Sequence, residues 1–289
     1  MNNILLFGAS GQVGSALQRS APADVNIISP TSSEVDMRDA RAVRAAMQEH
    51  MPDTIINCAA FTRVDDAEVE TESAYAINAD APRVLAAEAV RSGARLLHVS
   101  TDYVFSGNGH APFGIQSPAD PISVYGASKL AGEVAVLSTD PNAAVVRTAW
   151  VHSGGAVNFI ATAVRVLKMG TVLRVVDDQV STPTRAAHLA SALWTLATKA
   201  NIHGLLHFTD AGVASWYDVA ECVLETLLAE HAAGDGAAVI PVDSSEFPRQ
   251  ARRPCVSLLD KHSTWRELGI TPPHWRTGVI ASTKEILFA

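Results

Sequence analysis

A tyrosine and a lysine four residues apart, Tyr125 and Lys129, have the residue types and the spacing for proton transfer. In a helix, residues i and i+4 lie one turn apart on the same face. A tyrosine hydroxyl has an ordinary pKa of about 10, and a neighbouring ammonium group is expected to lower that pKa because it stabilises the phenolate. The tyrosine could then donate a proton to a substrate carbonyl. Such pairs also occur on ordinary helix surfaces, so the motif alone is weak evidence.

Thr101 supplies a hydroxyl group that could bind the same carbonyl oxygen. It lies in the segment Ser100-Thr-Asp-Tyr-Val-Phe105, at the end of an apolar run that predicts a buried strand over 95–100. In an open α/β sheet, ligands bind at the carboxyl ends of the strands. A strand end followed by an Asx-type turn would have the same composition. Thr101 is a candidate because it falls between a glycine-rich loop and the Tyr–Lys pair.

Three glycines, Gly8, Gly11 and Gly14, form the pattern GxxGxxG between a predicted strand and a predicted helix. Glycine here allows a tight turn, close approach of the backbone to a pyrophosphate, and close packing of the helix on the sheet. The helix N-terminus adds N–H donors and the positive end of the helix dipole. The loop therefore predicts a dinucleotide site, and Lys129 could hold the nicotinamide ribose. The other loop residues expected to bind the cofactor are Ser10, Gln12 and Val13.

The end of the second predicted strand lacks the acidic residue that usually binds an adenosine ribose hydroxyl. Ser29, Pro30 and Thr31 occupy this position, and no arginine stands immediately there. The missing carboxylate removes a partner for an unphosphorylated ribose and a charge that would repel a 2′-phosphate. The sequence leaves NADH and NADPH open, with a slight preference for NADPH or dual use. Further along, Asp36 could accept from the adenine amino group while Met37 packs on the ring, or the two could form a solvent-facing loop.

The elements that must position these residues alternate between strand and helix. Strands are predicted at 4–7, 25–29, 54–57, 95–100 and 144–147, with helices up to about residue 20 and at 40–50, 72–92 and 124–137. This alternation predicts an α/β fold with a doubly wound parallel sheet of the Rossmann type.

The pattern changes after Trp150 and predicts a smaller C-terminal α/β domain. Helices are predicted at 158–169, 184–198 and 215–230, strands at 172–176 and 204–208, a linker at 232–238, and irregular segments with short helices in the proline-containing tail. We expect residues 1–150 to form the NAD(P)-binding domain, with 184–212 returning to it. Residues 151–183 and 213–289 are expected to form the substrate-binding domain.

Composition excludes several other classes of protein. The 289 residues are 48% hydrophobic and carry a net charge of −8, which argues against nucleic-acid binding through phosphate neutralisation. The three cysteines form no CxxC pair and none of the ten histidines shows metal-ligand spacing, so neither a metal site nor a disulfide framework is predicted. There is no cationic leader and no apolar stretch of about 18 residues. We therefore expect a cytoplasmic protein that does not bind a membrane.

Several longer motifs resemble the extended short-chain dehydrogenases/reductases that act on nucleotide sugars, and among them the dTDP-4-dehydrorhamnose reductases. The resemblance covers nearly the whole chain. The blocks that carry it are Leu5-Leu-Phe-Gly8, Gly11-Gln-Val-Gly14, Asn57-Cys-Ala-Ala60, Val64-Asp-Asp-Ala-Glu68, Ser100-Thr-Asp-Tyr-Val-Phe105, Tyr125-Gly-Ala-Ser-Lys-Leu-Ala-Gly-Glu133, Arg147-Thr-Ala-Trp150, Ser215-Trp216 and Arg253-Pro254. The Ser100 and Tyr125 blocks together are specific, whereas the glycine loop is not.

The resemblance implies an oxidoreductase of dTDP-rhamnose biosynthesis, which reduces the C4 keto group of dTDP-4-dehydro-L-rhamnose to dTDP-L-rhamnose with NADPH or NADH. It makes Tyr125 the acid, Lys129 its partner and Thr101 the assisting hydroxyl. The residues expected to line the cofactor are Ala60, Phe61, Thr62 and Val99. The residues expected to face the sugar are Val64, Asp102 and Trp150. Arg253, beside Arg252, could clamp a diphosphate or be a surface charge.

The chain departs from the family pattern at two further positions. Phe61 stands where the family often has His or Tyr, and Ala16 stands where some members have a glutamate that binds magnesium at a dimer contact. We therefore expect no metal site and no metal-linked dimer, although magnesium remains an alternative. Monomer and homodimer both stay open. A core role for Trp150 also stays open, and His98 and Trp216 are expected to be core residues.

Three alternative functions remain at this point. The first is a nucleotide-sugar dehydratase or epimerase, but Tyr103 follows Asp102 where dehydratases carry a second carboxylate. The second is a non-catalytic, dinucleotide-binding regulatory subunit, since a fold does not fix a function. The third is a reductase that acts on another carbonyl substrate.

Overall fold

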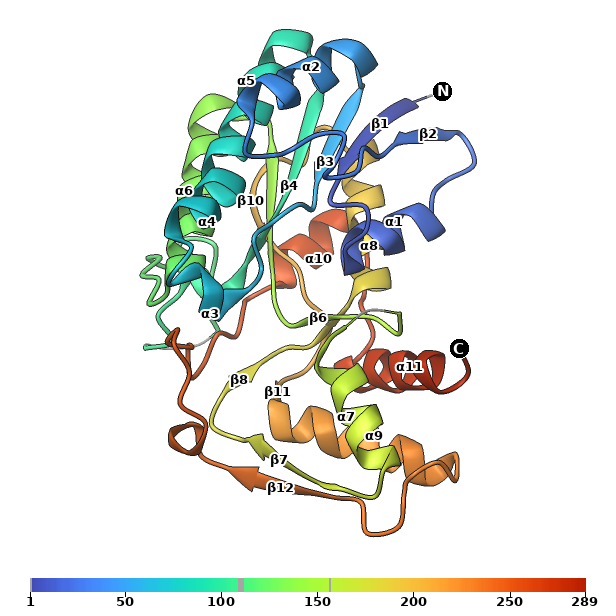
Figure 1. Ribbon diagram of the computed structural model, residues 1–289. Coiled ribbons are helices and arrows are strands. Elements are labelled where there is room, and N and C mark those ends of the chain that lie inside the picture. Colours follow the sequence, from blue (N-terminus) through green and yellow to red (C-terminus); the bar gives the residue numbers. More distant parts are fainter. Residues whose placement is uncertain (1, 109–111, 156) are drawn as a thin grey trace.

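Six parallel strands form the central sheet of the computed structural model, which describes residues 2–108, 112–155 and 157–289. Their order is β10-β5-β4-β3-β1-β2, as predicted for a doubly wound fold (Figure 1). The strands are β1 (Asn2–Phe7), β2 (Val25–Ile28), β3 (Thr54–Asn57), β4 (Arg95–Thr101), β5 (Ala144–Thr148) and β10 (Gly204–His207). Their apolar runs are buried because helices cover both faces of the sheet.

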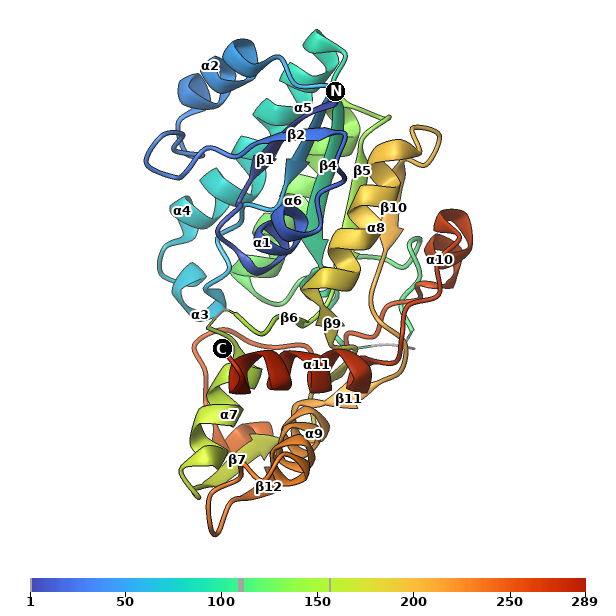
Figure 2. The same ribbon diagram turned by 90° about the vertical axis from the view of Figure 1, so that its right-hand side faces the viewer.

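Two groups of helices cover the two faces of the sheet (Figures 1 and 2). One face packs against α1 (Gln12–Arg19) and α8 (Ala186–Thr198), whose buried residues share a core with Ile4, Leu6 and Leu97. The other face packs against α2 (Ala40–His50), α5 (Ala81–Ser92) and α6 (Val124–Thr139). The α/β class and the Rossmann-type sheet are therefore confirmed.

The helix predicted at 72–92 contains a feature that its sequence did not reveal. It consists of α4 (Thr71–Tyr75), a π-helical turn (Ala76–Asp80) and α5. Asn78 in the π-helical turn is fully buried, and its side chain donates to Phe61 O at 3.2 Å and to Ser128 Oγ at 2.9 Å. These partners are distant in sequence, so the local helical pattern carries no sign of the wider turn. Nearby, the short helix α3 (Val64–Ala67) was also not predicted.

A smaller lobe lies below the sheet in Figure 1. Helices α7 (Phe159–Lys168), α9 (Trp216–Ala229) and α11 (Trp275–Leu287) share one apolar core, beside the parallel pair β7 (Val172–Val176) and β12 (Ala238–Val242). The predicted linker is found up to residue 237, and the tail contains irregular segments and a short helix as predicted. The strand β12, which pairs with β7, and the 13-residue helix α11, which packs on α9, were not predicted. The remaining elements are β6 (Val151–His152), β8 (Val180–Ser181), β9 (Thr184–Arg185), β11 (Ala214–Ser215), α10 (His262–Leu268) and the 3₁₀ turns Asp102–Val104 and Ser244–Glu246.

The chain passes between the two lobes more than once. After β7 and β8 it returns to the sheet, where α8 packs against α1 and β10 pairs with β5. Ser215 caps α9 with a capping box, in which its hydroxyl accepts from Asp218 N at 3.0 Å and Ser215 N donates to Asp218 Oδ2 at 2.7 Å. Figure 1 shows that the carboxyl ends of the central strands β1, β3, β4 and β5 face the smaller lobe.

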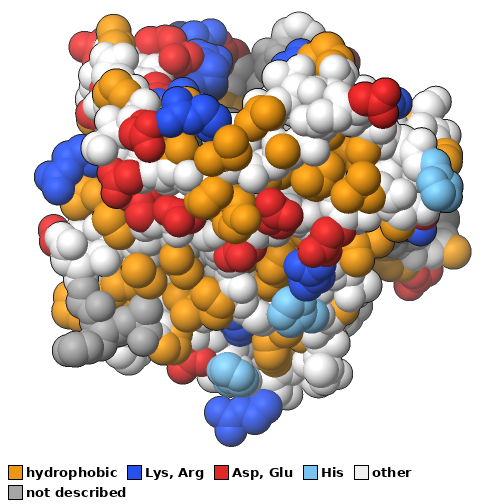
Figure 3. All heavy atoms as spheres, turned by 90° about the horizontal axis from the view of Figure 1, so that it is seen from below, with side chains coloured by type: hydrophobic (Ala, Val, Ile, Leu, Met, Phe, Trp, Pro, Cys, Tyr) orange, Lys and Arg blue, Asp and Glu red, His pale blue; other side chains and the backbone are white. Residues whose placement is uncertain are grey.

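The distribution of charged side chains on the surface gives no sign of a large basic patch on the face shown in Figure 3. Figure 3 shows the face seen from the small-lobe end, where acidic, basic and apolar side chains are interspersed and Lys and Arg do not gather into one patch. Among the described residues, none of the helices is both long enough and apolar enough to cross a membrane.

Candidate active site

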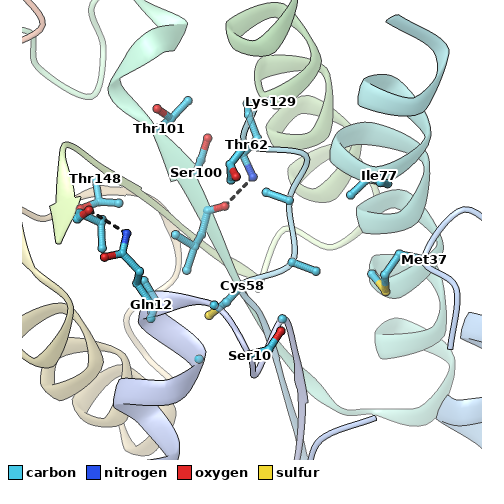
Figure 4. Close-up of a pocket in the computed structure, with 18 of the residues that line it drawn as sticks. Ser10, Gln12, Met37, Cys58, Thr62, Ile77, Ser100, Thr101, Lys129 and Thr148 are labelled. Atoms are coloured by element: carbon cyan, nitrogen blue, oxygen red, sulfur yellow. Dashed lines mark hydrogen bonds between the residues drawn. The ribbon is translucent and has the colours of Figure 1, made fainter. Parts of the chain in front are cut away.

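A cavity of about 820 Å³ lies at the carboxyl ends of β1, β3, β4 and β5. It extends from the loop before α2 to the start of the smaller lobe. Most of the predicted site residues line it: Gly8, Ser10, Gly11, Gln12, Val13, Gly14, Asp36, Met37, Ala60, Thr62, Val99, Thr101, Asp102, Tyr125, Lys129 and Trp150. Figure 4 shows many of these side chains around one space.

The glycine loop has no room for side chains at two of its positions. Gly8 has a φ of 79°, and a Cβ there would lie 2.5 Å from Ala59 N. A Cβ on Gly14 would lie 2.2 Å from Gly8 O, so α1 could not approach the loop as closely. No side chain caps α1 at Gly11. The first N–H groups of α1 are therefore available to an anion in the cavity, as pyrophosphate binding requires.

Gln12, the first residue of α1, joins the glycine loop to the smaller lobe. Its Nε2 donates to Val151 O at 3.0 Å, which is drawn in Figure 4. Its Oε1 accepts from Ser153 Oγ at 3.2 Å and from Asn158 Nδ2 at 2.9 Å. Asn158 in turn caps α7 by accepting from Ala161 N at 3.0 Å. The loop expected to hold a pyrophosphate is thus fixed to the segment that follows Trp150.

The structure brings Tyr125 and Thr101 together. Thr101 ends β4, and Tyr125 lies in the first turn of α6, which Ser123 caps by accepting from Gly126 N at 3.2 Å. A Cβ on Gly126 would lie 2.2 Å from Tyr103 O, so glycine lets α6 approach the 3₁₀ turn after β4. The rings of Tyr103 and Tyr125 then meet edge to face, with centroids 5.7 Å apart.

The pKa of Tyr125 is raised and not lowered, in contrast to the prediction. Burial raises the pKa of Tyr125 to about 12, and interaction with the Thr101 hydroxyl opposes that rise only partly. Lys129 Nζ donates to Val99 O at 2.7 Å (Figure 4). Burial lowers the pKa of Lys129 to about 8, against the effect of Glu133, which raises it. The Tyr125 phenol therefore keeps its proton at neutral pH, as a proton donor must.

Asp102 is buried where the two lobes meet, with 2% of its surface exposed. Its Oδ1 accepts from Thr101 Oγ1 at 3.1 Å, and its Oδ2 accepts from Ser181 Oγ at 3.3 Å and from Ser257 Oγ. Burial raises the pKa of Asp102 to about 6, while the hydrogen bonds, that of Ser257 foremost, oppose the rise. The carboxylate thus links the end of β4 to two segments of the smaller lobe.

Replacing Asp102 with asparagine is expected to raise the free energy of unfolding by about 1–3 kcal/mol at pH 8, because a buried charge is removed. Because the pKa of Asp102 is raised in the folded state, its protonated form stabilises the fold. This stabilisation is fully present below pH 3.8, the ordinary pKa, and is lost as the pH rises through about 6. Asparagine resembles the protonated form at every pH. In urea titrations, the gain in free energy of unfolding from Asp102→Asn should therefore be roughly half as large at pH 5 as at pH 8. A difference that does not change with pH would contradict this explanation.

Trp150 has a strained backbone and a well-fixed ring. Its φ of 46° is unusual for a bulky residue. Its ring stacks on Trp216, with centroids 3.8 Å apart and planes 10° apart, and Phe159 packs edge-on against Trp216 at 4.9 Å. Trp150 therefore both lines the cavity and packs against the smaller lobe. Such strain persists only where surrounding contacts hold it.

Comparison with known proteins agrees with this geometry. Residues 1–288 match the family model described as RmlD substrate binding domain. The chain belongs to this family. A dTDP-4-dehydrorhamnose reductase from Mycobacterium tuberculosis is 43% identical over an alignment of 284 residues that covers 96% of this chain and 90% of the relative. A probable dTDP-4,6-dihydroxy-2-methyloxan-3-one 4-ketoreductase from Streptomyces antibioticus is 39% identical over 99% of this chain and 96% of its own.

A solved structure extends the comparison. A dTDP-4-dehydrorhamnose reductase from Bacillus anthracis, crystallised in complex with NADP, has a TM-score of 0.89 and 32% identity, and the match covers 96% of this chain and 98% of that chain. The resemblance to the extended short-chain dehydrogenases/reductases is therefore confirmed at the level of family and fold.

Three of the predicted site residues do not line the cavity. Phe61 is buried, and its N–H donates to Asn78 Oδ1 at 2.8 Å. Val64 begins α3 and is half-buried outside the cavity. Arg253 forms a bidentate pair with Asp65, in which Nη1 lies 3.0 Å from Oδ1 and Nη2 lies 2.8 Å from Oδ2. The structure therefore does not bring these three to the RmlD-type cavity, and the Arg253 guanidinium already has a carboxylate partner.

Several lining residues were not predicted: Ser32, Arg38, Cys58, Ala59, Ile77, Ser100, Thr148, Val151 and Val157. Most follow a strand or stand next to a predicted residue, so the strand-end rule could have found them. Cys58 is a poor nucleophile, because burial raises the pKa of its thiol to about 12. Arg38 follows Asp36 and Met37 directly, which was the available signal for it.

Ala16 stands where some family members have a magnesium-binding glutamate, and we therefore expected no metal site there. In the structure Ala16 is buried in α1 and belongs to the core between that helix and the sheet, where it offers no ligand. Over residues 2–108, 112–155 and 157–289, no three His, Cys, Asp or Glu side chains lie close enough together to hold a metal ion. His98, expected to be a core residue, is buried in β4, and Asn57 Nδ2 lies 3.1 Å from its Nδ1.

Proposed function

We propose that the protein reduces the C4 keto group of dTDP-4-dehydro-L-rhamnose with hydride from NADPH or NADH. One observation carries this proposal: Thr101, Tyr125 and Lys129 lie on the same cavity as the glycine loop. A dinucleotide bound at the loop can reach from one end of the cavity to the other. Its nicotinamide would then lie beside Thr101, Tyr125 and Lys129, which together offer a hydroxyl, a phenol and an ammonium group.

The residues present fit such a cofactor. Gly8 and Gly14 leave the backbone open to a pyrophosphate, and the N–H groups at the start of α1 lie there without a side-chain cap. Ala60, Thr62 and Val99 would line the nicotinamide half, and Lys129 would hold its ribose. The bound cofactor supplies the hydride for reduction.

The side chains of this chain would supply the proton and the orientation. As hydride reaches the carbonyl carbon, the Tyr125 hydroxyl gives its proton to the carbonyl oxygen, so that an alcohol and a phenolate form. The nearby Lys129 ammonium stabilises that phenolate. The Thr101 hydroxyl, which donates to Asp102 Oδ1 at 3.1 Å in the free protein, would turn its one proton toward the same carbonyl oxygen when the substrate is bound. Proton donation by a positioned side chain typically accelerates a reaction by a factor of about 10²–10⁴.

The smaller lobe, residues 151–183 and 213–289, would bind the nucleotide sugar. Trp150 and Asp102 line the cavity next to this lobe, and the Trp216 stack fixes the Trp150 ring. The relatives support a dTDP-linked 4-keto sugar as the substrate class, since both the mycobacterial and the streptomycete relative are named for reduction of such a ketone. We prefer the rhamnose precursor because the higher identity is with the mycobacterial reductase.

The test is an assay with NADPH and dTDP-4-dehydrorhamnose, generated in place by its upstream enzymes. The absorbance of the reduced nicotinamide should fall as dTDP-rhamnose appears. Turnover on dTDP-4-keto-6-deoxyglucose but not on the rhamnose precursor would move the proposal to another sugar. Redox-neutral turnover with retained NAD⁺ would indicate an epimerase or dehydratase. Cofactor binding without hydride transfer to any dTDP- or UDP-keto sugar would indicate a regulatory subunit.

A further inference from the structure

The cavity has a second cationic side chain at the end opposite Lys129. Arg38 lines this end together with Ser32, Asp36 and Met37, all from the segment between β2 and α2. Arg38 and Lys129 are the only Lys or Arg residues among those that line the cavity within the described part of the chain. Because Lys129 lies beside Tyr125 and the glycine loop lies between the two ends, Arg38 lies where the adenosine half of a dinucleotide would extend.

Arg38 is held in place by its neighbour Asp36. Arg38 N donates to Asp36 Oδ1 at 2.9 Å, Nε donates to the same oxygen at 3.0 Å, and Nη2 donates to Oδ2 at 2.7 Å. Hydrogen bonds and charge from Arg38 lower the pKa of Asp36 to about 2, so the pair is fully ionised at neutral pH. These contacts use Nε and Nη2 and leave the Nη1 edge of the guanidinium for another anion.

The residues that directly follow β2 are uncharged, and the nearby Glu34 carboxylate accepts from Thr31 N at 2.7 Å and from Thr31 Oγ1 at 2.8 Å without lining the cavity. Ser29, Pro30 and Thr31 follow β2 where a carboxylate would bind an unphosphorylated ribose. Without that carboxylate, a ribose 2′-hydroxyl loses its usual partner and a 2′-phosphate meets less repulsion. An arginine can bind a phosphate through two parallel hydrogen bonds, which a neutral hydroxyl cannot match.

We propose that Arg38, assisted by the Ser32 hydroxyl, binds the 2′-phosphate of the adenosine ribose and makes the protein prefer NADPH to NADH. This inference rests on the dinucleotide site of the proposed function but not on the identity of the sugar. Asp36 orients the guanidinium and also places a negative charge near the phosphate, so the preference should be moderate. We expect NADP⁺ to bind on the order of 10-fold more tightly than NAD⁺, as for one charged hydrogen-bond pair on a partly exposed site.

The test compares dissociation constants of NADP⁺ and NAD⁺ for the whole chain, measured by calorimetry at low salt and without sugar. In Arg38→Gln the ratio of the two constants should fall to near one, because NADP⁺ binding weakens about 10-fold while NAD⁺ binding stays within a few-fold. Arg41→Gln is the matched control. Arg41 is an exposed arginine in the first turn of α2 that does not line the cavity, and this variant should keep the wild-type ratio.

A second pair of probes isolates the phosphate group. 2′,5′-ADP should bind more tightly than 5′-ADP to the wild type, and this advantage should disappear in Arg38→Gln and shrink as salt increases. An unchanged NADP⁺/NAD⁺ ratio in Arg38→Gln, or equal losses in Arg38→Gln and Arg41→Gln, would overturn the inference while leaving the proposed function intact. Failure of both dinucleotides to bind the wild type would overturn both proposals. Circular dichroism and thermal melting of the variants exclude misfolding as the cause.

Discussion

Tyr125→Phe is expected to lower kcat by about 10²–10⁴, with cofactor binding close to that of the wild type. The substitution removes only the hydroxyl, and the half-buried ring keeps its edge-to-face contact with Tyr103. Since burial raises the pKa of Tyr125 to about 12, the phenol is present as the protonated donor throughout the neutral range. In Tyr125→Phe, none of the described residues that line the cavity has a phenol to protonate the carbonyl oxygen. Steady-state kinetics with NADPH and the keto sugar, together with a cofactor titration, measure the two effects separately.

Tyr103→Phe provides the matched control for this experiment. Tyr103 is also largely enclosed and touches the same ring, but it does not line the cavity. We expect its kcat to stay within a few-fold of the wild type. Comparable losses in the two variants would mean that packing of the ring pair, and not proton donation, is the cause. Full activity of Tyr125→Phe would remove Tyr125 from its role and leave Thr101 and Asp102 to be examined as acids.

The parts of the fold that the sequence predicted well are those governed by local pattern. The strands at Thr54–Asn57 and Val172–Val176 were predicted with their observed bounds. In Thr54–Asn57 every residue is buried, so its short run reflects burial directly. The helix α2 has its predicted bounds for a similar reason, since Val43, Ala46 and Met47 lie on one buried face. In contrast, β12 contains Pro241 and has exposed residues, so its pairing with β7 gave no local signal.

In the site too, the residues identified by local sequence pattern were predicted, whereas properties that depend on tertiary contacts were not. The strand-end rule located Thr101, helical spacing located Tyr125 and Lys129, and the family resemblance located Asp102. The direction of the pKa shift of Tyr125 could not be predicted, because it depends on how deeply the folded chain buries the ring. The pairing of Arg253 with Asp65 could not be predicted either, since 188 residues separate the two in sequence.

A buried ion pair beneath the cavity gives the second large expected effect. Glu133 on α6 and Arg147 on β5 form hydrogen bonds at 2.9 Å (Nε to Oε1) and 2.6 Å (Nη2 to Oε2), and their side chains are only 3% and 4% exposed. Ser100 Oγ, from a residue that lines the cavity, donates to Glu133 Oε1 at 2.5 Å. The pair therefore ties the helix that carries Tyr125 and Lys129 to the strands beneath the site.

Arg147→Met is expected to lower the free energy of unfolding by about 3–5 kcal/mol, because it leaves the Glu133 carboxylate buried without its counter-charge. The double variant Glu133→Leu/Arg147→Met should recover most of that loss, since it removes the uncompensated charge as well. Urea denaturation at neutral pH measures both, and Arg174→Met is the control. Arg174 pairs with Glu246 at the surface, where the two side chains are 53% and 45% exposed, so its loss should cost less than about 1 kcal/mol.

The comparison of the three variants separates charge from packing. If the cost of Arg147→Met comes from the unpaired carboxylate, the double variant should be clearly more stable than Arg147→Met, whereas the cost of a cavity left by the shorter side chain would persist in the double variant. A loss no larger than that of Arg174→Met would show that the buried pair contributes no more than a surface pair. If the double variant is stable but its kcat is lowered, the ion pair serves to position α6 for catalysis, because the fold alone would then not require the two charges.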